Sequence, residues 1–129
     1  MLAASPFRNA AMTVRRIVAN LATGKPADVA RFYLELFDLK VVMDHGWLVT
    51  LASGDSALAQ VSLASEGGSG APVPDLSIEV DNLDEVHRRA LTGGHEIIYA
   101  LTIEPWGVRR FFLLDPLGTV VNVLEHRRG

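Results

Sequence analysis

The chain has 129 residues, and 12 lysines and arginines against 15 aspartates and glutamates give a formal charge of −3. The net charge is slightly negative and the Arg-Arg pairs are scattered along the chain, which does not predict a polyanion-binding face. We therefore expect no nucleic-acid partner. The absence of cysteine excludes disulfides, thiolate nucleophiles and cysteine-ligated zinc. No apolar run has the length of a membrane span, and the first residues lack the apolar core of a secretory signal. We therefore expect a cytoplasmic protein without membrane contacts.

The first half of the chain predicts a strand, a helix and three further strands after a flexible tail over residues 1–12. Val29, Phe32, Tyr33 and Leu36 recur at helical spacing, which predicts a helix over residues 27–37. The flanking β-branched and apolar runs end at glycine- or aspartate-containing turns and are typical of strands. The predicted strands are 14–23, 39–43, 47–52 and 57–63, within a first βαβββ module over residues 13–64.

The second half repeats this order after a Gly/Ser/Pro-rich segment over residues 65–74, whose composition indicates a flexible linker. A second helix is expected from Leu83, with Asp81 or Asn82 as N-cap and Gly93-Gly94 as its end. Such a linker permits the modules to pair within one chain or to exchange between two chains. The strands are expected at 75–80, 96–100, 108–114 and 119–124, within a second βαβββ module over 75–126 of the same domain.

Two such modules predict an α+β fold in which one curved mixed sheet surrounds a cleft. Each module buries one sheet face under its helix, and the other faces are expected to form a shared concave surface. Strand alternation assigns successive side chains to the helix-covered face and to the cleft face of the sheet. We expect Ile17, Ala19 and Leu21 to face the first helix, and Leu76, Ile78 and Val80 the second. The cleft then receives Val18, Asn20, Ala22, Asp75, Ser77 and Glu79, a mixed surface that suits a small organic molecule.

Three segments carry a family resemblance that extends over residues 14–126. Residues 30–42 (ARFYLELFDLKVV) and 76–84 (LSIEVDNLD) resemble the first helix–strand segment and the "EVDDLD" segment of the vicinal oxygen chelate superfamily. This is the superfamily of glyoxalases, bleomycin resistance proteins and dioxygenases. Residues 104–126 (EPWGVRRFFLLDPLGTVVNVLEH) resemble its C-terminal "EPWGxREFxxxDPxGNxxEL" segment most specifically. The resemblance implies the same pair of βαβββ modules around a cleft.

Metal-dependent members of this superfamily hold a divalent ion with His and Glu side chains, and the matching positions here carry other residues. They are Val18, Gln60, Asp75 and Asn122. An aliphatic side chain cannot ligate, and amides bind hard ions weakly, so we expect no metal cofactor. His45, His87, His95 and His126 lack the spacing that would rebuild a site, and the adjacent Glu125 and His126 point to opposite faces of a strand.

The resemblance leaves two functions open. The first is metal-free binding of an aromatic or antibiotic-like small molecule by a homodimer, as in bleomycin-resistance members, whose clefts stack flat rings on aromatic side chains. The second is a metal-dependent lyase, isomerase or dioxygenase, with Glu79 or Asp75 as a base. We favour the first, because the side chains that would coordinate the ion are missing. The candidate ligand-binding residues are Asn20, Trp47, Asp75, Glu79, Trp106, Arg109, Phe111 (or its neighbour Phe112) and Asn122.

Overall fold

The computed structural model describes residues 11–54 and 59–127, so most of the predicted tail and residues 57–58 of the predicted fourth strand lie outside the described residues. The first module comprises β1 (Val14–Ala22), α1 (Pro26–Phe37), β2 (Leu39–Asp44), β3 (Leu48–Ser53) and β4 (Gln60–Ala64). The second comprises β5 (Leu76–Val80), α2 (Leu83–Thr92), β6 (Ile97–Ile103), β7 (Val108–Leu114) and β8 (Val120–His126). The predicted α+β fold is confirmed.

All eight strands form one sheet in the order β2-β3-β4-β1-β5-β8-β7-β6. Within each module the first and last strands run parallel, as β1 with β4 and β5 with β8. The modules meet where β1 and β5 pair antiparallel, with Val18 opposite Ser77. In this structure the two modules therefore pair within one chain and contribute two strands each to the middle of the sheet.

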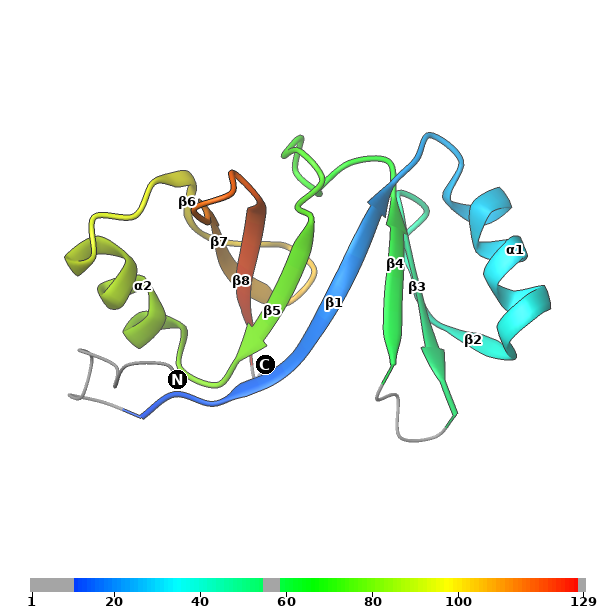
Figure 1. Cartoon of the computed structure of the whole chain (residues 1–129), viewed down its shortest axis with the longest axis horizontal. Coiled ribbons are helices and arrows are strands. Elements are labelled where there is room, and N and C mark those ends of the chain that lie inside the picture. Colours follow the sequence, from blue (N-terminus) through cyan, green and yellow to red (C-terminus); the bar gives the residue numbers. More distant parts are fainter. Residues whose placement is uncertain (1–10, 55–58, 128–129) are drawn as a thin grey trace.

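The two helices lie at opposite ends of the molecule, on the outside of the sheet (Figure 1). Each covers a separate hydrophobic core. The core beside α1 contains Ala30, Val49, Leu51 and Leu63. The core beside α2 contains Val80, Leu83, Ala90, Phe111 and Val123. Because both cores lie on the outer face, the inner face of the central strands is left for a binding site.

One expectation about the outer face is wrong. Ile17 and Leu21, expected beneath the first helix, are 58% and 41% exposed. The reason is the sheet order: α1 packs on β2, β3 and β4, whereas β1 lies at the seam between the modules. On the other side of the seam, Ile78 and Val80 do pack in the core beside α2.

The start of α2 is fixed by a side-chain cap. Asn82 Oδ1 accepts the backbone N–H of Glu85 at 3.3 Å, while Asp81 accepts the backbone N–H of Thr13 instead. Of the two predicted N-cap residues, Asn82 is thus the one used. Among the described residues, no helix is long and apolar enough to cross a membrane.

Candidate functional site

The inner face of the central strands encloses a cavity of about 180 Å³. Its floor comes from β1, β4, β5 and β8, and its walls from β3, β7 and the turns that precede them. Apolar and polar side chains alternate over this surface because each strand exposes every second residue to it. The lining includes Val18, Met43, Leu48, Ala64, Val108 and Leu124 as apolar residues.

Both tryptophans of the chain line this cavity, and their rings contact each other. Trp47 precedes β3 and Trp106 precedes β7, so each module contributes one. Their ring centroids lie 5.4 Å apart with planes inclined by 62°, an edge-to-face arrangement. His45 stacks on Trp47 at 5.7 Å. The aromatic end of the cavity is therefore built jointly by the two modules.

The segment between the modules, residues 65–74, lies over this aromatic end, and we call it the strap. Although its composition indicates a flexible linker, Gly67 and Gly68 are buried and the backbone closes a turn through Gly67 N–H to Ala71 O at 2.8 Å. At Gly68 the backbone adopts φ +87°, and a Cβ there would lie 2.6 Å from the ring of Trp106. Only glycine fits at position 68, where the strap backbone lies against the two tryptophan rings.

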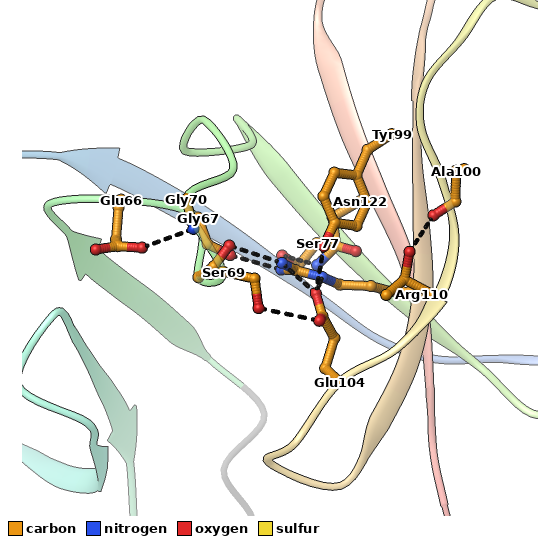
Figure 2. A network of polar contacts seen from close by, with 12 residues as sticks. Glu66, Gly67, Ser69, Gly70, Ser77, Tyr99, Ala100, Glu104, Arg110 and Asn122 are labelled. Carbon is orange, nitrogen blue, oxygen red and sulfur yellow. Dashed lines mark hydrogen bonds and ion pairs between the residues drawn. The ribbon is translucent and has the colours of Figure 1, made fainter.

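A buried arginine holds the strap in place. Arg110 donates to the carbonyls of Gly67 at 2.6 Å and Gly68 at 3.1 Å, and pairs with Glu104 at 2.6 Å. Figure 2 shows its guanidinium directed at Gly67 of the strap and at Glu104. Tyr99 and Ser69 also donate to Glu104, and the guanidinium lies 4.9 Å from the ring centroid of Trp106. Both ionic partners are thus hydrogen-bonded, as burial requires.

Two lines of polar side chains cross the cavity floor. In the first, Asn20 and Asn122 donate their amide N–H groups to Ser77 Oγ at 2.9 and 3.1 Å. Asn122 Oδ1 is buried and lacks a hydrogen-bond partner among the described residues. This line joins β1, β5 and β8 through side chains at neighbouring register positions.

The second line, which we call the polar row, comprises Gln60, Arg16, Glu79 and His126 from β4, β1, β5 and β8. Arg16 donates Nη1–H to Gln60 Oε1 at 2.9 Å and Nε–H to Glu79 Oε1 at 2.6 Å. His126 Nδ1 lies 3.0 Å from Glu79 Oε2. Arg16, Glu79 and His126 line both the cavity and a shallower groove outside it, so the polar row marks the open end of the cavity.

The fold agrees with the comparison with known proteins. The profile of the Glyoxalase/Bleomycin resistance protein/Dioxygenase superfamily matches residues 14–123, nearly the whole chain. The chain belongs to this superfamily.

Solved structures support the same fold at low sequence identity. A superfamily member from Vibrio splendidus 12B01 aligns with a TM-score of 0.62 at 17% identity, over 88% of this chain and 99% of that one. An NAD-dependent benzaldehyde dehydrogenase from Legionella pneumophila gives 0.69 at 16%, over 86% and 99%. A Mn(II)-bound glyoxalase from Novosphingobium aromaticivorans gives 0.56 at 14%, over 90% and 41%. No curated protein sequence matches the chain.

Five of the eight candidate ligand-binding residues line the cavity, namely Asn20, Trp47, Glu79, Trp106 and Asn122. Three lie elsewhere. Asp75 caps the start of β8 by accepting the N–H of Val120 at 2.9 Å. Phe111 is buried in the core beside α2, and Arg109, on the same face of β7, pairs with Asp84 and Glu125 at 3.0 Å each. Strand alternation sends both away from the cavity and directs Arg110 into it.

The ion pair between Arg109 and Asp84 lies outside the cavity and shifts the pKa of both groups. The Arg109 guanidinium hydrogen-bonds to Asp84 and lowers the pKa of that carboxyl, and the same contact raises the pKa of Arg109. Arg109 therefore fastens the start of α2 to β7 and is occupied by carboxylates of its own chain. Phe112, the alternative to Phe111, packs against Tyr99 at 4.8 Å and is buried.

Three residues with important contacts in the cavity were missed by sequence reasoning: Arg16, Arg110 and His126. Arg16 has the same strand parity as Val18 and Asn20, so alternation could have found it. His126 was set aside because Glu125 points to the opposite face. Its carboxylate partner is Glu79, which is 47 residues away in sequence and adjacent only across the β5–β8 pairing.

The side chains at the superfamily's metal-ligand positions do not fit a divalent ion. Val18 is aliphatic, Gln60 Oε1 accepts from Arg16, and Asp75 Oδ2 accepts from Val120 N–H outside the cavity. Asn122 presents a single amide oxygen, Oδ1, which is a weak ligand for a hard ion. The guanidinium of Arg16 also adds a positive charge beside these positions. Across residues 11–54 and 59–127, no group of three or more His, Asp or Glu side chains is arranged to hold a metal.

Proposed function

We propose that this protein binds a small aromatic molecule in its cavity without a metal ion. One observation carries the proposal: the two tryptophans form an edge-to-face pair beside a cavity in which the metal positions Val18 and Asn122 carry an aliphatic side chain and an amide. Aromatic faces with a few fixed polar groups are what a site for a flat organic molecule needs. Metal-assisted chemistry of the superfamily requires a divalent ion, and the side chains of this cavity do not suit one.

The cavity volume limits the size of the ligand. About 180 Å³ is below the roughly 300–1,000 Å³ of pockets that hold drug-sized molecules, and close to the roughly 150 Å³ of cavities that hold benzene. The proposed ligand is therefore a molecule of one or two rings. Of a larger antibiotic, only one such ring would fit inside, with the remainder outside the polar row.

Intrinsic fluorescence tests the binding directly, because the two tryptophans are the only ones in the chain and both line the cavity. We expect one- and two-ring aromatic compounds to quench this emission in a saturable manner. The variants Trp47→Phe and Trp106→Phe should each keep saturable quenching of the remaining tryptophan, with a weaker affinity because one indole ring of the site is lost. A broad set of such compounds that leaves the emission unchanged would contradict the proposed function.

The alternative, a metal-dependent lyase, isomerase or dioxygenase, is tested with the same protein. We expect Mn²⁺, Ni²⁺ or Zn²⁺ to change neither the melting temperature nor the affinity for an aromatic probe. One bound ion per chain with a clear rise in melting temperature would favour the enzyme, since a ligand that binds only the folded state stabilises it.

A cytoplasmic location stays a prediction.

We also propose that the protein is a homodimer. Several large apolar side chains lie exposed on the outer surface, among them Leu36 at 64% and Phe37 at 60% on α1, together with Ile17 on β1. Exposed apolar side chains of this size are available to an interface between two copies of the chain. Light scattering after size exclusion should give twice the monomer mass. The variant Leu36→Glu should weaken that assembly while its helix remains folded.

A further inference from the structure

The formal charges inside the cavity are compensated by partners of the chain itself. Arg16 pairs with Glu79, and Arg110 pairs with Glu104, both at 2.6 Å. Glu66 also lines the cavity, but it is an exposed strap side chain whose Oε1 accepts the N–H of Gly70. Because each buried charge has its counter-charge, a ligand that brings a charge of its own would be desolvated without a new partner.

The polar row nevertheless keeps two hydrogen-bonding positions open at the cavity. Arg16 uses Nε and Nη1, and among the described residues Nη2 has no partner. A carboxylate only accepts, so Glu79 fixes the proton of a neutral His126 on Nδ1 and leaves Nε2 as an acceptor. The row therefore offers one donor, Arg16 Nη2–H, and one acceptor, His126 Nε2.

We propose that the polar row selects a neutral aromatic carboxamide or lactam as the cavity's ligand. The aromatic ring would contact Trp47 and Trp106, the amide carbonyl would accept from Arg16, and the amide N–H would donate to His126. This inference rests on the proposed function, because it names the ligand class of the same cavity. A cationic ligand is not favoured, since Asp75 is outside the cavity and Glu79 is already paired with Arg16.

Three probes of one shape and different charge test the inference: benzamide, benzoate and benzamidinium. Each has one ring and a planar three-atom head group, with charges of 0, −1 and +1. At about pH 8 we expect benzamide to bind at least about tenfold more tightly than either ion. Tryptophan quenching gives the affinities, and calorimetry provides an independent measurement.

Two variants should change the charge preference in opposite directions. Glu79→Gln leaves Arg16 uncompensated, so benzoate should become the tightest probe. Arg16→Met leaves Glu79 uncompensated, so benzamidinium should gain about tenfold relative to benzamide. The matched control is Arg15→Met on the same strand, because Arg15 is exposed and does not line the cavity. A merely structural role for the row would weaken all three probes together.

The outcomes separate this inference from the proposed function. Equal affinities for the three probes, or tighter binding of an ion by the unaltered protein, would overturn the inference and leave aromatic binding intact. Variants that fold but keep the preference for benzamide would also overturn it. If none of the probes and no other one- or two-ring aromatic compound quenches the tryptophans, the proposed function itself fails.

Discussion

The two modules share one topology but stabilise the cavity wall by different chemistry. In the first module, β3 and β4 place the hydroxyls of Thr50 and Ser62 2.7 Å apart, a buried neutral pair. In the second module, the wall carries the ion pair between Arg110 and Glu104, each only 4% exposed. A neutral pair needs one hydrogen bond, whereas a buried ion pair needs several.

The strap explains why the second module needs an ion pair. By sequence the strap follows β4, but its fixed carbonyls bind Arg110 of β7. The hydroxyl pair of the first module makes a contact within its own wall, whereas Arg110 joins three parts of the molecule: the strap, the β6–β7 turn and the aromatic end of the cavity. Equivalent strands can therefore share a fold while only one of them, β7, holds the strap against the site.

Removing the arginine should have the largest effect. Arg110→Met leaves Glu104 buried without its cation and frees the strap carbonyls, so we expect the free energy of unfolding to fall by about 3–5 kcal/mol. Denaturation in urea measures the loss. The matched control is Arg109→Met, which loses ion pairs to the exposed Asp84 and the partly exposed Glu125, and it should cost only about 1 kcal/mol.

The tryptophans give a second measurement on the same pair of variants. Arg110→Met should shift their emission, because the guanidinium lies against Trp106 and holds the strap above it. Arg109→Met should leave the emission unchanged, since Arg109 lies on the opposite face of β7. Equal stability losses for the two variants would contradict the special role of the strap contact.

A smaller effect is expected where the strap meets the tryptophans. Gly68→Ala places a methyl group 2.6 Å from Trp106 and 2.9 Å from Trp47, so it should destabilise the fold by about 1–3 kcal/mol and alter tryptophan emission. Gly70→Ala is the matched control, because Gly70 also has a positive φ but nothing within 4 Å of its Cβ. If both variants lose the same stability, the backbone conformation alone explains it and the close contact with the rings is unimportant.

The fold was largely predictable from the sequence because its signals are local. Strand alternation, the helical stripe from Val29 to Leu36 and the glycine-containing turns depend on neighbours within a few residues. The outer face of β1 was assigned wrongly, since the helix that covers a strand depends on sheet order. Local pattern does not determine that order: β1 pairs with β4 and β5, which lie far away in sequence.

The candidate site was predictable only in part. Asn20 and Glu79 follow from strand alternation, Trp47, Trp106 and Asn122 follow from the family resemblance, and all five line the cavity. The polar row depends on contacts that span 44, 47 and 63 residues in the chain, which no local pattern reveals. Likewise, the composition of the strap indicates flexibility, and only the position of Arg110 across the cavity gives it a fixed path.

The two helices extend the contrast between the modules and give the smallest predicted effect. In α2, hydrogen bonds from Arg88 and then Arg89 lower the pKa of Glu85 from 4.5 to about 2. In α1, Asp28 and Arg31 are both exposed and lie 3.9 Å apart. A carboxyl whose pKa is lowered by folding stabilises the folded state above its unfolded pKa and loses that contribution as the pH falls.

Acid denaturation of Glu85→Gln should therefore reveal the contribution of α2. Above about pH 5 the unaltered protein should be the more stable, and this advantage should shrink as the pH falls from 4.5 towards 2, where Glu85 takes up its proton in the folded state. Urea midpoints measured at intervals through this range test the window. Asp28→Asn is the control in α1, and its effect on the midpoint should be much smaller because both partners are solvated. An advantage of the unaltered protein that stays constant through the window would show that Glu85 stabilises α2 by packing instead of by its charge.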